Sequence, residues 1–170
     1  MVVSTYQAPV YNLCYRMLGS PQDAEDAAQE TFWRAYQGLA KYDPARPFVT
    51  WLLSIAAHYC IDQHRRKKLP NLEIDDVMEE VLPDYNPGPE LTYSRNEEER
   101  RLHQVIETLQ PHDRAAVVLH YWYDFSDQEV AAALSLSVSA VKSRLFRARQ
   151  QLAKNWKAAQ TEAPTPLEEP

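Results

Sequence analysis

The stretch from Ser126 to Arg149, SDQEVAAALSLSVSAVKSRLFRAR, indicates how the second half of the chain folds. Ser126 can cap a helix N-terminus, and Glu129, three residues further on, completes a capping box. The short helix that starts here should end near Leu134, and Ser137 can cap the next helix. Two helices joined by a turn of three or four residues form a helix-turn-helix, so the stretch predicts this motif.

The helix after Ser137, predicted to run to about Lys154, has two chemically different faces. Its apolar residues recur at three- and four-residue steps and should be buried: Val138, Val141, Leu145, Ala148 and Leu152. The opposite face is cationic and rich in hydrogen-bond donors: Ser139, Lys142, Ser143, Phe146 and Arg147. A major groove accepts one α-helix, and Lys or Arg pairs there with guanine, so this face suits DNA readout.

Two residues of this helix and the face as a whole need separate interpretation. Arg144 lies nearer the flank, where phosphate contacts are expected. Phe146 fits a base contact and packing on a neighbouring side chain about equally well. For the face as a whole, the alternative is an ordinary solvated basic surface. The capped helix-turn-helix directly upstream favours DNA readout.

Charge is segregated along the chain, although the net charge of −6 taken alone argues against a nucleic-acid partner. Residues 41–68 carry 6 basic and 2 acidic groups, and residues 138–157 carry 6 basic groups and no acidic one. Residues 69–100, which lie between them, carry 2 basic and 10 acidic groups. Basic patches on particular helices matter more for DNA binding than the total charge does.

Composition predicts an all-helical protein, because the chain has only 3 glycines in 170 residues and few β-branched runs. We expect two small helical domains, residues 1–68 and 96–157, joined by a flexible acidic linker over 69–95. A marginal helix near Ile74–Val81 and a disordered tail over 158–170 complete this prediction. No apolar stretch is long enough for a membrane span, and Met1 is not followed by a signal peptide pattern. We therefore expect a cytoplasmic protein without membrane insertion, with Cys14 and Cys60 as buried free thiols.

The first block contains two predicted helices before its basic segment. The first runs from Tyr6 to Leu18 and stops at Gly19. Ser20 can cap the second, with Pro21 at its first position. The second helix has an apolar stripe, predicted to face the core: Ala24, Ala28, Phe32, Ala35, Tyr36 and Leu39. Its opposite side carries Asp23, Asp26, Glu30 and Arg34.

A third predicted helix, from about Phe48 to Arg66, combines aromatic and basic side chains on one face. That face consists of Trp51, Ser54, His58, Asp62 and Arg65. Rings and cations together suit unstacked single-stranded bases and their phosphates. From spacing alone, core packing explains Trp51 better. Cations at a helix C-terminus are also favoured by the helix dipole, but they would still bind phosphate.

These segments resemble a known family in both halves of the chain. The first block is similar to region 2 of the sigma-70 family, in its small extracytoplasmic-function (ECF) group. The matching strings are GSPQDAEDAAQETF at 19–32, YDP at 42–44, RPF at 46–48, WL at 51–52, IA at 55–56 and ID at 61–62. Residues 126–129 and 137–149 resemble region 4. The resemblance implies a three-to-four-helix bundle and a helix-turn-helix domain in a non-catalytic protein that directs RNA polymerase to promoters.

The resemblance also implies roles for individual residues. Asp26, Gln29 and Glu30 match the segment that binds the clamp helices of the largest polymerase subunit, and an acidic face would complement a basic coiled coil. The expected minus-ten residues are Phe48, Trp51, His58, Asp62, Arg65 and Arg66. The expected minus-thirty-five residues are Ser139, Lys142, Ser143, Arg144, Phe146 and Arg147. Many members are held inactive by an anti-sigma factor, so such a partner is expected here, and no cofactor or metal is.

Two positions depart from the family pattern. Ser135 stands where the turn usually has glycine, so a left-handed backbone conformation would cost free energy there. His58 stands where many members have asparagine, which leaves the minus-ten base preference open.

Two other classes of protein fit the sequence less well. A metal protein or enzyme built on His58, Cys60 and His64 would lack the usual ligand spacings, nucleophile motifs and glycine-rich phosphate loop. A plain DNA-binding regulator would explain residues 126–157. It would leave the segment DAAQE at 26–30 and the loop at 42–48 without a purpose.

Overall fold

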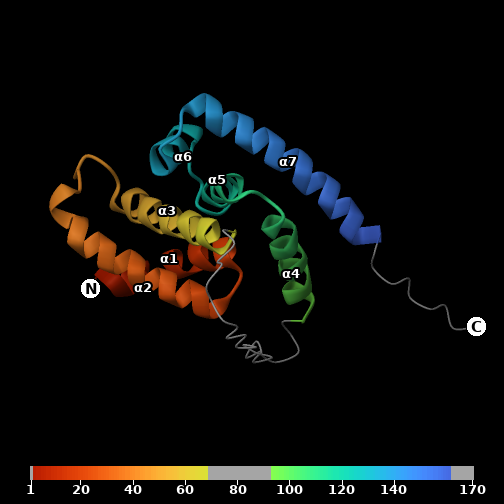
Figure 1. Cartoon of the computed structure of the whole chain (residues 1–170), viewed down its shortest axis with the longest axis horizontal. Helices are drawn as coiled ribbons and strands as arrows, with labels where there is room; N and C mark the ends of the chain where they lie inside the picture. Colours follow the sequence, from red (N-terminus) through yellow and green to blue (C-terminus); the bar gives the residue numbers. More distant parts are fainter. Residues whose placement is uncertain (1, 69–92, 162–170) are drawn as a thin grey trace, which may run out of the picture.

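The computed structural model describes residues 2–68 and 93–161, which form two helical units (Figure 1). The first unit contains α1 (Val2–Leu18), α2 (Pro21–Gly38), the 3-10 turn η1 (Leu39–Lys41) and α3 (Phe48–Lys68). The second contains α4 (Tyr93–Glu107), α5 (Pro111–Trp122), α6 (Asp127–Leu134) and α7 (Val138–Thr161). No strand occurs among these described residues, so the all-helical prediction is confirmed. The helix predicted near Ile74–Val81 lies outside them.

Helix starts follow the predicted caps. The Ser20 hydroxyl accepts the backbone N–H of Asp23 at 3.3 Å, with Pro21 in the first turn of α2. At α6 the capping box is complete, because the Ser126 hydroxyl accepts the N–H of Glu129 at 3.1 Å and the Glu129 carboxylate accepts the N–H of Ser126 at 3.3 Å. The Ser137 hydroxyl caps α7 in the same way, through Ala140 at 3.0 Å. These local signals therefore set where α2, α6 and α7 begin.

Three predicted boundaries were wrong. Helix α1 begins at Val2 rather than Tyr6 and continues through Pro9, because packing on α2 and α3 outweighs weak local propensity. Helix α4 begins at Tyr93, inside the predicted linker. Helix α7 runs to Thr161, past the predicted end and into the predicted tail, since no Gly or Pro interrupts that segment.

The first unit is a three-helix bundle in which α2 contributes small side chains. Its buried residues are Ala24, Ala27, Ala28, Thr31 and Ala35, which let α2 lie close to α1 and α3. The predicted stripe was wrong at its end, because Tyr36 is 74% exposed and Leu39 is 52% exposed. Because α2 buries its alanine face against α1 and α3, Tyr36 and Leu39 lie on the other side and are exposed to solvent.

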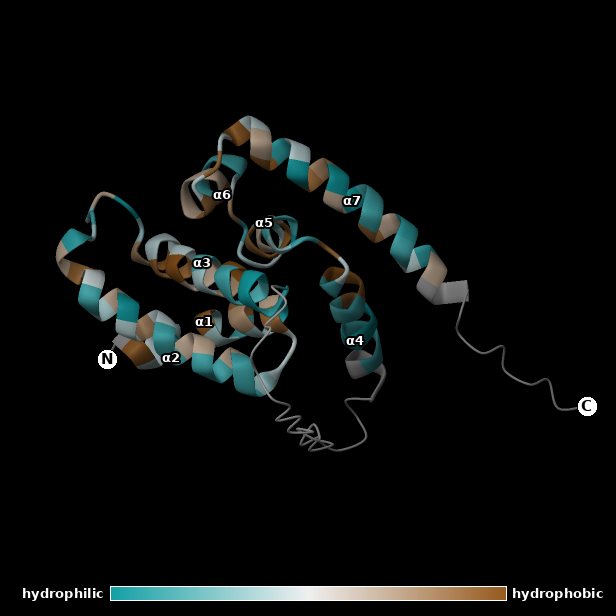
Figure 2. Ribbon diagram, in the orientation of Figure 1, coloured by the Kyte–Doolittle hydropathy of each residue, from teal (hydrophilic) through white to brown (hydrophobic). Residues whose placement is uncertain are grey.

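The second unit is arranged around α5, which has an almost continuous run of buried residues from Asp113 to Leu119. Helix α5 packs against α6 and α7 of its own unit and also against α1 and α3 (Figure 1). A single cluster of buried hydrophobic residues extends through both units. In Figure 2, hydrophobic and hydrophilic residues alternate along α7, as expected for a helix with one face on this core.

Candidate nucleic-acid and polymerase interface

The reading face predicted on the last helix lies on the surface of α7. Phe146 is 60% exposed, and Ser139, Lys142, Ser143 and Arg147 are exposed with it. Four of these five residues line one shallow hollow: Lys142, Ser143, Phe146 and Arg147. On the opposite side Val141, Leu145 and Ala148 are buried, whereas Val138 and Leu152 are half-buried. The structure thus presents two cations, two hydroxyls and one ring on a single accessible face.

Arg144 is placed differently from the rest of its predicted set. Its guanidinium donates to the Asp113 carboxylate of α5 at 2.8 Å, and the Arg144 side chain is 28% exposed. It ties α7 to the centre of the second unit instead of standing on the hollow beside Phe146.

The turn between α6 and α7 has the strained geometry that the sequence predicted. Ser135 adopts φ 55° and ψ 43°, in the left-handed region, and its N–H donates to the carbonyl of Ala131. Glycine reaches this region without penalty, whereas a residue with a Cβ does not. The turn is therefore formed at the expense of backbone strain at one position.

Aromatic rings gather at the start of α3 and fix the loop that precedes it. The ring centroid of Tyr42 lies 4.9 Å from that of Trp51 and 5.5 Å from that of Phe48, and Tyr6 of α1 lies 5.2 Å from Phe48. The Tyr42 hydroxyl also donates to the carbonyl of Arg46 across the loop. Phe48 and Trp51 are half-buried in this cluster, so packing accounts for Trp51, as the spacing indicated, and also for Phe48. Sequence reasoning missed Tyr6, because its partner is 42 positions away.

The other residues predicted for the minus-ten face separate along α3. His58 is half-buried and lies on the side near α5, where its neighbours include His112. Asp62, Arg65 and Arg66 are exposed at the C-terminal end of the helix. The face therefore consists of a packed aromatic start, a half-buried middle and a cationic end.

The polymerase-binding residues predicted on α2 lie on its outer surface. Asp26 and Gln29 are exposed, and Glu30 accepts from Arg34 at 2.8 Å. Beyond them lie three exposed apolar residues that the sequence had assigned to the core or left unassigned: Trp33, Tyr36 and Leu39. When the buried face of a helix consists of alanines, the spacing of its apolar residues does not distinguish an exposed aromatic side chain from a buried one.

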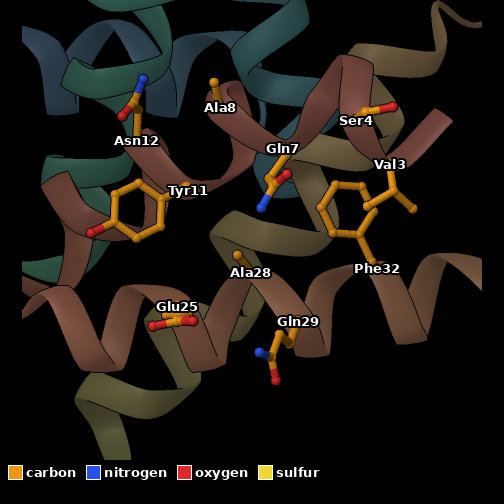
Figure 3. Close-up of a pocket in the computed structure, with 10 residues that line it drawn as sticks. All are labelled: Val3, Ser4, Gln7, Ala8, Tyr11, Asn12, Glu25, Ala28, Gln29 and Phe32. Atoms are coloured by element: carbon orange, nitrogen blue, oxygen red, sulfur yellow. The ribbon is translucent and has the colours of Figure 1, made fainter. Parts of the chain in front are cut away.

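A groove of about 450 Å³ lies between α1 and α2 (Figure 3). Its walls come from both helices: Val3, Ser4, Gln7, Ala8, Tyr11 and Asn12 on α1, and Glu25, Ala28, Gln29 and Phe32 on α2. Gln29 thus belongs both to this groove and to the predicted polymerase face.

Within the described residues, no group of three or more His, Cys, Asp or Glu side chains is placed to hold a metal ion. Cys14 and Cys60 are buried free thiols, as predicted. A hydrogen bond with Cys14 and burial both raise the pKa of the Cys60 thiol, which keeps it protonated. Among the helices that the structure describes, none is long and apolar enough to cross a membrane.

Comparison with known families matches both units. Residues 2–69 match the Sigma-70 region 2 family, and residues 99–152 match the Sigma-70, region 4 family. The chain is 35% identical over 162 residues to the ECF RNA polymerase sigma factor SigW of Bacillus subtilis, covering 90% of this chain and 86% of that protein. The chain belongs to the sigma-70 family, as an ECF sigma factor. It directs promoter-specific transcription initiation by RNA polymerase and is an initiation factor, not an enzyme.

Further relatives of this ECF sigma factor agree. The RNA polymerase sigma-H factor of Pseudomonas aeruginosa is 30% identical, with 91% of this chain and 83% of that protein covered. The fold matches the sigma factor RpoE in complex with the anti-sigma factor NepR from Bartonella quintana, at a TM-score of 0.67, 19% identity and coverage of 91% and 94%. It also matches CnrH in complex with the cytosolic domain of CnrY, at a TM-score of 0.65, 26% identity and coverage of 95% and 87%.

Proposed function

We propose that this sigma factor binds polymerase and the two promoter elements through three separate surfaces. The outer surface of α2 binds the clamp helices of the largest polymerase subunit, α3 and its preceding loop engage the minus-ten element, and α7 reads the minus-thirty-five element. Residues 1–68 then serve as region 2 and residues 96–157 as region 4. The observation that carries the proposal is the exposed face of α7 directly behind a complete capping box.

The chemistry of α7 supports major-groove reading. Lys142 and Arg147 can donate to guanine edges or phosphates, and Ser139 and Ser143 can donate or accept. Phe146 is 60% exposed, which allows contact with a thymine methyl group. Arg144 supports the reading helix from behind through Asp113.

The chemistry of α3 supports contact with an opened strand. Arg65 and Arg66 are exposed at the helix end, where cations can bind the phosphates of single-stranded DNA. Phe48 and Trp51 hold the loop at 42–47 in shape, and we propose that this loop receives an unpaired minus-ten base. His58 and Asp62 lie along the same helix and are assigned to the flanking bases.

The chemistry of α2 supports a protein partner. Asp26 and Glu30 are acidic and Gln29 can both donate and accept, so the face complements a basic coiled coil. The same helix exposes Trp33. Aromatic residues that become buried when a partner binds often contribute much of the binding free energy.

We also propose that an anti-sigma factor regulates this chain and that it acts in the cytoplasm, where bacterial polymerase transcribes. The support is that a structurally similar sigma factor, RpoE, was solved bound to the anti-sigma factor NepR.

Reconstituted transcription tests the assignment. Purified chain, bacterial core polymerase and a pool of promoter fragments should give discrete start sites. Gln29→Ala combined with Glu30→Ala should weaken core binding by roughly tenfold or more, because it removes polar groups from the interface centre. Gln150→Ala, an exposed change on α7, should leave core binding intact. If the double variant binds core polymerase as the wild type does, the α2 assignment is wrong.

A further inference from the structure

An exposed tyrosine of α5 lies beside the reading face of α7. Tyr121 is in the last turn of α5 and is 50% exposed. Its hydroxyl accepts a hydrogen bond from Nε of Arg149 at 2.6 Å, and the guanidinium carbon lies 5.9 Å from the centre of the Tyr121 ring. Helices α5 and α7 pack against each other (Figure 1), so this contact joins two elements of one unit. Neither residue is among those assigned to the minus-thirty-five element.

Arg149 continues the stripe of α7 that contains Lys142 and Phe146. The three residues are separated by four and then by three positions, which places them on one side of the helix. Lys142 and Phe146 line the shallow hollow of the reading face, and Arg149 is exposed one turn beyond Phe146. At about 1.5 Å per residue, Arg149 lies roughly 10 Å further along the helix axis than Lys142.

This separation decides which part of a duplex Arg149 can reach. A major groove is about 12 Å wide, and the N-terminal part of a reading helix contacts the base edges inside it. When Lys142 contacts a base edge, a side chain roughly 10 Å further along the helix reaches the rim of the groove, where the phosphates lie. Arg149 is therefore suited to contact the DNA backbone rather than a base.

The bond to Tyr121 leaves most of the guanidinium available to a ligand. The hydroxyl occupies only the N–H on Nε of Arg149, so the N–H groups on both Nη atoms remain. The Tyr121 oxygen accepts this bond through a lone pair, and its own proton can still be donated. Arginine and tyrosine side chains both donate to phosphate oxygens in protein–DNA complexes. Two kinds of phosphate donor thus lie next to each other on the surface.

Arg144 and Arg149 lie on the same helix but have partners of different charge. Arg144 pairs with the Asp113 carboxylate at 2.8 Å, which compensates its charge. Arg149 is held by an uncharged hydroxyl, and in the part of the chain that the structure describes no carboxylate forms an ion pair with it. The positive charge of Arg149 is therefore available to an anion. Because Tyr121 already orients the guanidinium, less conformational entropy is lost when that anion binds.

We propose that Tyr121 and Arg149 form a two-donor site for one DNA phosphate at the edge of the reading face. Arg149 supplies the charge and the Nη donors, and Tyr121 both orients the guanidinium and donates its own proton to the same phosphate. The site extends the DNA contact from α7 to α5. The proposal rests on the assignment of α7 as the minus-thirty-five reader, and it adds a contact that carries no sequence information.

Fluorescence anisotropy of the whole chain with two labelled duplexes tests the site. One duplex is the sequence that the chain enriches most from a random pool, and the other is a scrambled sequence of the same length and composition. Arg149→Ala should weaken binding to both duplexes by the same factor, about tenfold or more at low salt, and should lower the salt slope by about 0.9. A loss confined to the enriched duplex would identify Arg149 as a base reader, and an unchanged slope would exclude a phosphate contact. Either result overturns the proposal.

Tyr121→Phe tests the hydroxyl alone, because the ring and its packing are kept. The variant should weaken binding to both duplexes by about 3- to 10-fold without changing the salt slope, since it removes hydrogen bonds but no charge. Combined with Arg149→Ala, it should cause a loss smaller than the product of the two single factors, because both residues act on one phosphate. Wild-type DNA affinity in Tyr121→Phe would overturn the two-donor site. Circular dichroism checks that each variant is folded.

Two variants of the first unit are matched controls. Tyr36→Phe removes the hydroxyl of a tyrosine that is 74% exposed on α2. Arg34→Ala removes an arginine whose guanidinium lies 4.9 Å from the centre of the Tyr59 ring, a contact of the same kind as that between Arg149 and Tyr121. Both controls should leave the affinity for the two duplexes and the salt slope unchanged.

Three results separate this site from the proposed function. If the wild-type chain binds both duplexes equally well, minus-thirty-five reading fails, while the salt slope of Arg149→Ala still decides the phosphate site. If the wild type prefers the enriched duplex and Arg149→Ala behaves like the wild type, the reading assignment stands and the phosphate site is wrong. A wild-type chain that binds neither duplex at low salt contradicts both.

Discussion

Arg144 of α7 donates a hydrogen bond to Asp113 of α5 at 2.8 Å, and the Asp113 side chain is 10% exposed. The pair joins the proposed reading helix to the central helix of its unit. A residue that looks like one more cation on a basic helix therefore holds that helix in place. Its neighbours Lys142 and Arg147 have no such tie among the described contacts and remain on the surface.

Arg144→Ala should lower the stability of the chain more than it lowers the specificity of DNA reading. Removal of Arg144 leaves the buried Asp113 carboxylate without its partner, which should reduce the free energy of unfolding by about 1–3 kcal/mol. Urea unfolding followed by circular dichroism measures this change. A variant with wild-type stability but no preference for a minus-thirty-five sequence would show instead that Arg144 is a base reader.

Lys142→Ala and Arg147→Ala should behave in the opposite way. Both side chains are exposed, so stability should hold, while affinity for a minus-thirty-five duplex should fall by about 1–3 kcal/mol for a base contact. Fluorescence anisotropy at several salt concentrations distinguishes the roles, because loss of a phosphate contact lowers the salt slope by about one. Lys154→Ala, an exposed change further along α7, is the control and should have a smaller effect.

Ser135→Gly should stabilise the helix-turn-helix. Ser135 occupies the left-handed region at φ 55°, which glycine adopts freely, so relief of strain should add about 0.5–1 kcal/mol to the free energy of unfolding. Ser139→Gly is the matched control, since the same substitution inside the first turn of α7 should destabilise by a similar amount. Thermal unfolding of both variants checks the sign, and a destabilised Ser135→Gly variant would contradict the strain argument.

Acid should weaken the contact between the two units through His64. Burial lowers the pKa of His64 below its ordinary value of 6.5, and the cations Arg114, Lys67 and Lys68 lower it further, against the hydrogen bond to Met17, which raises it. The neutral ring is therefore favoured in the folded chain. Its contribution is complete above about pH 6.5 and is lost as the pH falls below that value.

Burial also lowers the pKa of His103 and His112, so these groups add to the same acid sensitivity. Unfolding measured at about pH 7.5 and about pH 5.5 should show lower stability at the acid value. His64→Gln should reduce the difference between the two pH values, because its side chain does not titrate. If His64→Gln and wild type lose equal stability on acidification, His64 makes no contribution to the effect.

Much of the local structure could be predicted because its causes lie within a few residues. Ser20, Ser126 and Ser137 cap their helices through bonds to residues three positions away, and spacing alone identifies such bonds. The same holds for the two faces of α7, where the apolar period separates buried Leu145 from exposed Phe146.

The prediction failed where a helix had two plausible faces. On α2 the apolar period included Tyr36, but the bundle buries the alanine strip, and Tyr36 is 74% exposed. The sequence pattern locates apolar residues on a helix, whereas the partner helices decide which of them are covered. Arg144 shows the same limit for a charged residue, because its partner Asp113 lies 31 positions away.

The sequence by itself determined the all-helical class, the caps that start α2, α6 and α7, the helix-turn-helix and the segregation of charge, since each depends on interactions between near neighbours in the chain. Only the tertiary structure decided that the two units close on each other. Arg114 reaches Met17 across 97 positions, and Tyr123 reaches Pro9 across 114. No rule of sequence spacing relates such pairs, because their approach depends on how all the helices pack together. The sequence also does not distinguish a buried arginine, such as Arg114, from an exposed one.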